Sequence, residues 1–271
     1  MRPNTSLLSS IGALVGLVAS SEQPDSSGLQ VPLSSSDEIC VHPSYQVQII
    51  SSSPLVMYIK DFLTAQECAH LRAISINSFR HSVVADGKRS AQRTSQSTYV
   101  ESDHVVRCIE ERALAFQGHD VQPSQLEPLQ LVKYAPGEHY HFHADWFSDP
   151  AYKLAVNGGN RVSSFFAYIY VRNDTTGGGT NFPLLSPPVS DRWCDVVDCD
   201  EPYNRGLTFR PVEGNAVYWE NLHPEDGSGN QKTLHAGLPV TAGEKIGMNI
   251  WTRQAPLSDE AVAGLHDYPD L

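Results

Sequence analysis

Hydrophobic residues along the chain change their spacing near Pro128. Before that point, VQII from Val47 and PLVMYI from Pro54 are short apolar runs that predict two strands. Two longer stretches then carry apolar residues at the period of a helix. The folded domain is therefore expected to begin near Val47, with strands first and helices after them.

Two helices are predicted in this first half of the chain. Thr64 stands three residues before Glu67, which is a capping-box pattern typical of a helix start. Apolar residues then follow at helical spacing, at Ala65, Cys68, Leu71, and Ile74 or Ser75. The second helix is predicted from about Asp103 to Gln117, with a buried stripe formed by Val105, Val106, Ile109, Ala113 and Phe116.

Beyond Pro128 the apolar residues come in short runs bounded by Gly, Pro and Asn. The runs are LQLVKY, HYHFHADWF, VSSFFAYIYV, LTF, NAVYW, KTLHAG and KIGMNIWTR. Several short strands separated by turn signals are typical of a β-sandwich or barrel. The fold is therefore predicted to be mainly β, with the two N-terminal helices packed on one outer face of the sheet.

The segments that flank this domain differ in composition. Residues 1–20 predict a secretory signal, because Arg2 precedes an apolar stretch that ends in the small-x-small pattern Val18-Ala19-Ser20. A disordered leader or an uncleaved anchor is the alternative. Residues 21–46 are rich in Ser, Pro, Asp and Gln and predict a flexible linker. Residues 47–255 form the predicted domain, and residues 256–271 an acidic, solvated tail.

Charge and cysteine content narrow the possible functions. The chain has 19 Lys and Arg against 31 Asp and Glu, a net charge of −12, without a basic cluster, so no nucleic-acid partner is expected. No apolar stretch of membrane-spanning length follows the leader, so no membrane partner is expected after signal removal. The five cysteines are an odd number; in an oxidising lumen, Cys194 and Cys199 could close a small loop.

The densest chemical signal is the run EHYHFHAD that starts at Glu138. In an extended strand alternate side chains share a face, so His139, His141, His143 and Asp145 are predicted to point the same way. A surface strand with exposed histidines is one interpretation. The ending His-x-Asp favours another, because an imidazole and a carboxylate on one face suit a ferrous site that takes a second imidazole from elsewhere.

Three downstream histidines could supply that second imidazole. His223 lies in a segment of loop composition, and His266 lies in the acidic tail. His235 is followed ten residues later by Lys245, and two strands joined by a turn would bring both to one interior surface. A cation there suits an anionic ligand, because an unpaired buried ammonium costs several kcal/mol. An exposed strand position is the alternative for Lys245.

Five segments of the second half form an ordered set. They are YAPGE from Tyr134, HAD from His143, GGTNFP from Gly178, LHAGLPV from Leu234, and Lys245 with Trp251. Together they resemble the prolyl 4-hydroxylase family of iron(II)- and 2-oxoglutarate-dependent dioxygenases. The resemblance extends from roughly Pro54 to Arg253. It implies that the β-rich domain is a double-stranded β-helix, which is a jelly roll.

The resemblance implies an iron(II) site formed by His143, Asp145 and His235. An aspartate and two neutral imidazoles nearly balance the charge of a ferrous ion, and three protein ligands leave three open positions. The family uses 2-oxoglutarate as cosubstrate and dioxygen as oxidant, and it releases succinate and CO2. Ascorbate is expected as the reductant. No catalytic residue beyond the metal ligands is implied.

Four further residues are implied to hold 2-oxoglutarate. Lys245 would pair with its distal carboxylate, and Tyr134 and Thr180 would donate hydroxyl hydrogen bonds to that same carboxylate. Trp251 would pack beside it. The alternative for Tyr134 and Trp251 is a plain role as core aromatics.

Three residues are expected to contact the substrate. The family typically lines its peptide groove with an Arg-Thr-Ser segment followed by an aromatic residue, and RTSQSTY from Arg93 to Tyr99 matches it. Arg93 would hydrogen-bond a substrate carbonyl; a polar edge strand is the alternative. Trp219 falls in a region that the family places near the substrate.

These assignments predict a dioxygenase that hydroxylates an unactivated C–H bond, most simply of peptidyl proline. One alternative is a small-molecule 2-oxoglutarate oxygenase that acts on a free amino acid or a secondary metabolite. The other is a non-catalytic metal-binding jelly-roll protein, in which His139, His141 and His143 serve zinc or the fold. The expected location is the secretory pathway, either the endoplasmic reticulum lumen or outside the cell. The sequence indicates no oligomeric state.

Overall fold

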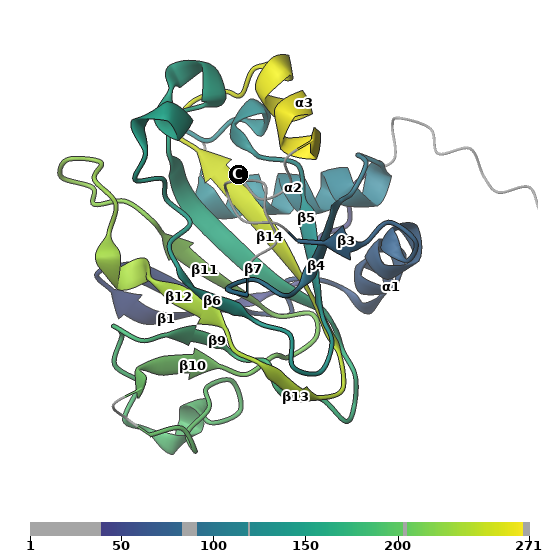
Figure 1. Ribbon diagram of the computed structural model, residues 1–271, viewed down its shortest axis with the longest axis vertical. Helices are drawn as coiled ribbons and strands as arrows, with labels where there is room; N and C mark the ends of the chain where they lie inside the picture. Colours follow the sequence, from purple (N-terminus) through teal and green to yellow (C-terminus); the bar gives the residue numbers. More distant parts are fainter. Residues whose placement is uncertain (1–38, 83–90, 119, 203–204, 268–271) are drawn as a thin grey trace, which may run out of the picture. The chain divides into compact units, whose positions relative to one another are not determined.

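Two antiparallel sheets dominate a computed structural model that describes residues 39–82, 91–118, 120–202 and 205–267 (Figure 1). The predicted signal and all but the end of the predicted linker lie outside these residues. Within them, every helix is too short or too polar to cross a bilayer.

The larger sheet has eight strands in the order β1-β2-β11-β7-β14-β5-β4-β3. At its centre β7 (Arg161–Val171) pairs antiparallel with β14 (Lys245–Arg253). The other strands are β1 (Gln46–Ser52), β2 (Leu55–Lys60), β3 (Arg80–His81), β4 (Gln96–Tyr99), β5 (Gln130–Tyr134) and β11 (Ala216–Glu220). The runs at Val47 and Pro54 are thus strands, as predicted.

The smaller sheet has four strands in the order β10-β9-β12-β6. These are β6 (Tyr140–His143), β9 (Thr180–Phe182), β10 (Leu207–Phe209) and β12 (His235–Gly237); β8 (Thr176–Gly177) and β13 (Val240–Ala242) form a separate pair. Buried aromatic side chains from both sheets pack in one cluster between them, among them Tyr58, Phe182, Phe209 and Trp219. Two antiparallel sheets packed face to face are the predicted jelly roll.

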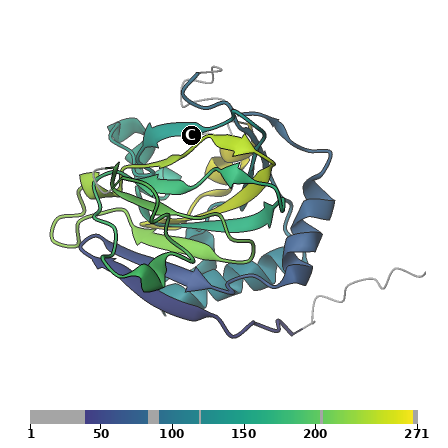
Figure 2. The ribbon, with the colours of Figure 1, turned by 90° about the horizontal axis from the view of Figure 1, so that it is seen from below.

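The two predicted helices are α1 (Ala65–Ser75) and α2 (His104–Gln117), and both cover the outer face of the larger sheet (Figure 2). Because side chains alternate along a strand, β7 turns Phe165 and Ile169 toward the helices and Tyr168 toward the smaller sheet. Leu71 of α1 and Ile109 of α2 pack in the same cluster as the first pair. The predicted placement of the helices is therefore confirmed.

The start of α1 has the predicted capping box. The Thr64 hydroxyl accepts a hydrogen bond from the Glu67 N–H at 3.1 Å, and the Glu67 carboxylate accepts one from the Thr64 N–H at 2.8 Å. The same carboxylate binds the buried Arg112 of α2 at 2.5 Å, so one side chain both caps α1 and fixes it to α2.

The end of the chain differs from its prediction. Residues 259–267 form a third helix, α3 (Asp259–Asp267), instead of a solvated tail, and Leu265 is only 5% exposed. Asp259 and Glu260 occupy its first turn, where negative charge favours a helix. The acidic composition therefore marked a helix start. Short 3₁₀ helices also occur in the described part of the chain, at Pro123–Gln125, Pro150–Lys153, Ala155–Asn157, Asp191–Trp193 and Gln231–Thr233.

Two disulfides join the described cysteines. Cys194 and Cys199 are bonded, as the sequence suggested. Cys40 is bonded to Cys108 of α2, so the end of the predicted linker is fixed to the domain. Cys68 is buried without a disulfide partner among the residues described.

Candidate iron and 2-oxoglutarate site

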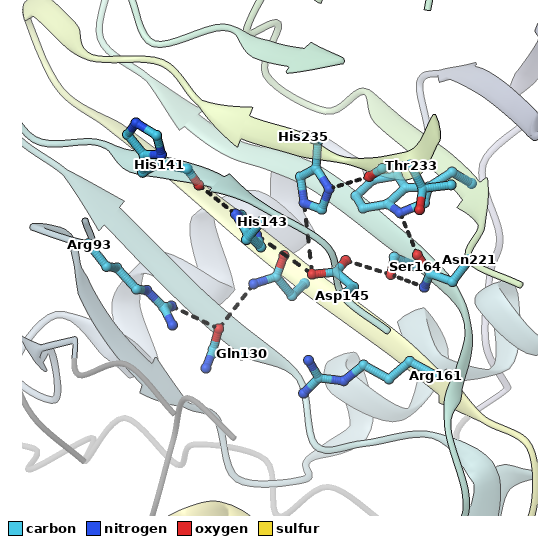
Figure 3. Close-up of polar contacts among 12 residues, drawn as sticks. Arg93, Gln130, His141, His143, Asp145, Arg161, Ser164, Asn221, Thr233 and His235 are labelled. Atoms are coloured by element: carbon cyan, nitrogen blue, oxygen red, sulfur yellow. Dashed lines mark hydrogen bonds and ion pairs between the residues drawn. The ribbon is translucent and has the colours of Figure 1, made fainter. Parts of the chain in front are cut away.

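Three side chains from two distant parts of the sequence meet in the smaller sheet. His143 ends β6, Asp145 follows it, and His235 begins β12, directly opposite His143 in the antiparallel pairing. Asp145 Oδ1 lies 3.7 Å from His143 Nε2 and 3.8 Å from His235 Nε2. Figure 3 shows the three side chains turned toward one another.

Each imidazole is held through its other nitrogen. His143 Nδ1 lies 2.8 Å from the His141 carbonyl oxygen, and His235 Nδ1 lies 2.9 Å from the Thr233 carbonyl oxygen. A carbonyl can only accept a hydrogen bond, so each Nδ1 carries the proton and each Nε2 keeps its lone pair. Both lone pairs are therefore available to a metal, with the ring orientation fixed from behind.

The carboxylate of Asp145 is also held by a hydrogen bond to one of its two oxygens. Asp145 is 5% exposed, and its Oδ2 accepts a hydrogen bond from the Ser164 hydroxyl at 2.7 Å. Burial alone would raise the pKa of Asp145, but His235, His143 and Arg161 outweigh it and lower that pKa. Burial, and then the charge of His235, lower the pKa of His143 to about 3. An ionised carboxylate beside neutral imidazole is the protonation state that metal binding requires.

A cavity of about 150 Å³ adjoins the three ligand atoms. Its walls are mostly aromatic, from Tyr134, Tyr140, Phe147, Tyr152, Phe166 and Trp251. Arg93, Arg161, Thr180 and Asn249 add polar groups. A small, largely aromatic cavity with a few polar groups is typical of a site that binds one organic ligand.

Lys245 lies behind this cavity and is fully buried. Its ammonium donates a hydrogen bond to the Gly178 carbonyl and sits 4.6 Å from the centre of the Tyr134 ring. Burial lowers the pKa of Lys245 to about 7. A cation that is so poorly compensated in the ligand-free protein is suited to an anionic ligand.

Two more of the residues predicted to hold 2-oxoglutarate, Thr180 and Trp251, line the cavity. The Thr180 hydroxyl lies 2.8 Å from the Tyr168 hydroxyl, in β9 and β7 respectively. Trp251 is 6% exposed, and its indole N–H has no hydrogen-bond partner among the residues that the structure describes. A buried donor without a partner is costly unless a ligand satisfies it. These groups fit a small anion with several acceptor oxygens.

Comparison with known proteins shows which family the chain belongs to. Residues 129–253 match the 2OG-Fe(II) oxygenase superfamily. The chain is 33% identical over 230 residues to the probable prolyl 4-hydroxylase 4 of Arabidopsis thaliana, which covers 81% of this chain and 74% of that protein. The chain belongs to the 2OG-Fe(II) oxygenase superfamily. Its members, including the prolyl 4-hydroxylases to which it is similar, are 2-oxoglutarate-dependent dioxygenases.

Two further relatives agree with this family. Prolyl 4-hydroxylase 1 of Arabidopsis thaliana is 31% identical over 220 residues, which cover 78% of this chain and 73% of that protein. The solved structure of a viral collagen prolyl hydroxylase from Paramecium Bursaria Chlorella virus-1, with 2-oxoglutarate bound, has a TM-score of 0.54 at 23% identity and covers 73% of this chain and 95% of its own. This structural likeness shows the shared jelly-roll fold.

Of the three residues that were expected to contact substrate, one lies on the cavity wall. Arg93 is 4% exposed and lines the cavity of this dioxygenase, with its guanidinium 4.5 Å from the centre of the Tyr140 ring. Tyr99 and Trp219 are absent from the described residues that line the cavity. Trp219 is 1% exposed, because β11 turns it into the space between the sheets, and its ring packs 4.8 Å from that of His235. Trp219 thus packs against a proposed iron ligand, and its contact with substrate stays a prediction.

The row of histidines also differs from its prediction. Only His143 and Asp145 reach the site; His139 is partly exposed and His141 is exposed, contributing its carbonyl oxygen. The reason is that β6 is short and its pairing with β12 shifts register, so regular alternation does not extend along the row. Tyr140 accordingly stacks on His143, three residues away, with ring centres 3.6 Å apart.

Of the remaining histidine candidates, the structure describes the side chain of His223 alone, and it does not join the site. His223 lies in a turn, where its N–H donates to the Ser228 carbonyl. The side chain of His266 is outside the described part of the structure.

One buried charge cluster beside the cavity had no signal in the sequence. Glu127 is fully buried and accepts two hydrogen bonds from Arg161, both at 2.7 Å, and another from Arg253. Arg161 also lies over the Trp251 ring, 3.8 Å from its centre, and lines the cavity. One carboxylate between two guanidiniums leaves this wall positive. The residues are 34 and 126 positions apart from Glu127, so only the fold brings them together.

Proposed function

We propose that this dioxygenase hydroxylates peptidyl proline, with iron(II) held by His143, Asp145 and His235. The observation that supports it is that each of the three side chains offers one ligand atom to a common point, while its second polar atom is hydrogen-bonded away from it. That donor set is typical of a non-haem ferrous oxygenase. Bound iron(II), with 2-oxoglutarate and dioxygen, supplies the oxidant for the C–H bond and yields succinate and CO2.

Lys245 and its neighbours would hold 2-oxoglutarate. The Lys245 ammonium would neutralise the distal carboxylate, and Tyr134 and Thr180 would add hydroxyl hydrogen bonds to it. The Trp251 N–H has no hydrogen-bond partner among the residues described, and the bound cosubstrate would satisfy it on the same cavity wall. This arrangement explains why a lysine is kept fully buried at a site where the protein alone compensates it so poorly.

The cavity wall suits a prolyl residue of a peptide. Tyr140, Phe147 and Trp251 offer aromatic faces to an apolar ring, and Arg93 and Arg161 offer hydrogen bonds to peptide carbonyls. Glu127 would orient Arg161 for this contact through its two hydrogen bonds. The names of the relatives, prolyl 4-hydroxylases and a collagen prolyl hydroxylase, support the same substrate class.

We also infer that the protein works in the secretory pathway, with ascorbate as the reductant that maintains ferrous iron. Two disulfides, Cys40–Cys108 and Cys194–Cys199, support an oxidising compartment. The predicted signal at residues 1–20 supports it independently.

The test is a turnover assay with matched substrates and variants. Purified protein is supplied with iron(II), ascorbate, 2-oxoglutarate and either a proline-rich peptide or free proline. Succinate formation and a mass increase of one oxygen on the peptide are expected; oxidation of free proline alone would contradict the peptide assignment. D145A should lose turnover, whereas D174A, at an exposed aspartate paired with Arg172, should keep it. Turnover by D145A would contradict the ligand assignment.

A further inference from the structure

A buried polar chain runs behind Asp145. Asn221, fully buried just after β11, donates from Nδ2 to the Ser164 hydroxyl at 2.8 Å. Its Oδ1 accepts a hydrogen bond from Trp219 Nε1 at 2.9 Å. Ser164 in turn donates to Asp145 Oδ2 at 2.7 Å (Figure 3). Three side chains thus lead to Oδ2 of Asp145, the carboxylate oxygen that does not face the two imidazoles.

The same asparagine is connected to His235. The Trp219 ring packs edge-on against the His235 ring, with centres 4.8 Å apart. The Asn221 carbonyl accepts from the Asn230 N–H at 2.8 Å, and the Asn230 carbonyl accepts from the Thr233 hydroxyl at 2.7 Å. The Thr233 carbonyl holds His235 Nδ1. Asn221 is therefore joined to two of the three proposed ligands by separate routes.

The chemistry of the groups fixes the direction of each hydrogen bond in this chain. An indole N–H can only donate, so the amide of Asn221 must turn its oxygen to Trp219 and its nitrogen to Ser164. A serine has one proton, so a Ser164 hydroxyl that accepts from Asn221 gives its proton to Asp145. The hydrogen bonds therefore have a single consistent set of directions. They occupy Oδ2 of Asp145 and leave its Oδ1 for the metal.

We propose that Asn221 is a positioning residue of the iron site, which fixes the single-oxygen orientation of Asp145 through Ser164 and the ring plane of His235 through Trp219. This inference rests on the proposed function, since it concerns the metal that these ligands would hold. Groups that orient metal ligands typically change metal affinity by roughly 10- to 100-fold when they are replaced. A network that only stabilised the core would leave the affinity of the folded protein unchanged.

The most informative variant is Asn221→Asp, because aspartate has nearly the same shape as asparagine. Its carboxylate still accepts from Trp219, but it cannot donate to Ser164 and competes with Asp145 for the one Ser164 proton. Ser164→Ala removes the same donor to Asp145 without new charge, and it keeps the proposal testable should Asn221→Asp fold poorly. Asn215→Asp is the matched control, because Asn215 is a buried asparagine bonded to the Tyr58 hydroxyl and to the Asp61 N–H, outside the site.

The experiment is a cobalt(II) titration of the whole metal-free protein, followed by the visible absorption of the bound ion and paired with a thermal melt of each variant. The proposal expects Asn221→Asp and Ser164→Ala each to weaken cobalt binding by roughly 10- to 100-fold and to alter its spectrum. The double variant should be no weaker than the weaker single one, because both act through one hydrogen bond. Asn215→Asp should bind cobalt within about threefold of the parent, even where it lowers the melting temperature.

Two results would overturn the inference, and they are distinguishable from each other. Parent-like affinity and spectrum in folded Asn221→Asp and Ser164→Ala, or losses that add in the double variant, would show that the network serves only the core. The proposed function itself, and with it this inference, would be overturned if the parent protein bound no cobalt. The same holds if D145A bound cobalt as tightly as the parent.

Discussion

Replacing Lys245 by methionine should make the ligand-free protein more stable. Lys245 is fully buried in β14, with one hydrogen bond to the Gly178 carbonyl and the faces of Tyr134 and Phe166 4.6 and 5.5 Å from its ammonium. Methionine fills a similar volume without a charge. A buried charge that is replaced by an apolar side chain often stabilises a fold by 1–4 kcal/mol, on the order of the values measured for buried ion pairs.

The pKa of Lys245 sets the size and the pH window of this effect. Burial lowers this pKa from 10.5 to about 7, and at about 1.4 kcal/mol for each pH unit this corresponds to about 5 kcal/mol. The unfolded chain holds its proton up to about pH 10.5, so the penalty is complete below pH 7 and disappears as the pH rises from 7 to 10.5. The advantage of K245M should therefore be largest at or below pH 7 and shrink toward pH 10.

Urea unfolding of the parent and K245M between pH 6 and pH 10 measures this difference directly. K133M is the control, because Lys133 on the neighbouring strand is partly exposed and paired with Glu244 at 2.9 Å, so its difference from the parent should not follow this pH course. 2-Oxoglutarate at 100 times its dissociation constant should stabilise the metal-loaded parent by about 2.7 kcal/mol and leave K245M unchanged. A K245M variant that is less stable than the parent at pH 7, or whose difference does not vary with pH, would refute the reasoning.

Three further predictions concern the framework of the site. E127Q should lower the free energy of unfolding by about 3–5 kcal/mol and raise the KM for peptide, because it leaves Arg161 and a second buried guanidinium without their carboxylate; urea unfolding and steady-state kinetics measure both. T64A should lower stability by about 1 kcal/mol through loss of the α1 cap, measured by thermal unfolding. C40S should cost about 2–4 kcal/mol and C194S less, because the first disulfide closes 68 residues and the second only 5.

Each of these has a clear contrary result. An E127Q protein within 1 kcal/mol of the parent, as an order-of-magnitude threshold, would show that the guanidiniums do not depend on that carboxylate. A T64A variant that is as stable as the parent would show that Glu67 caps the helix alone. Greater loss from C194S than from C40S would show that loop length does not govern these two disulfides.

Local patterns predicted most of the elements and the meeting of three candidate ligands, because each depends on few residues. The capping box at Thr64 needs only Glu67, and the continuous apolar run of β7 is typical of a strand buried on both faces. The meeting of His143, Asp145 and His235 could be predicted because the first two are two positions apart in sequence and the third lies in a motif shared with a known family.

The support of the site could not be predicted, because it depends on contacts between distant residues. Ser164 and Asn221 are 57 positions apart, and neither has a motif around it. Trp219 was expected beside substrate, yet strand alternation turned it inward against His235. In α3 the acidic residues had the composition of a tail, and only the buried Leu265 shows that the segment packs. Composition and residue spacing therefore do not predict these contacts.

The central claim is that one iron(II) ion is held by two histidines and one aspartate. An anaerobic titration with iron(II), read by metal content after gel filtration, tests it most directly in the parent and in H143A, D145A and H235A. The account predicts one iron per chain in the parent and loss of tight binding in each variant, with correctly folded protein by circular dichroism. Stoichiometric tight binding that survives in any of the three folded variants would contradict it.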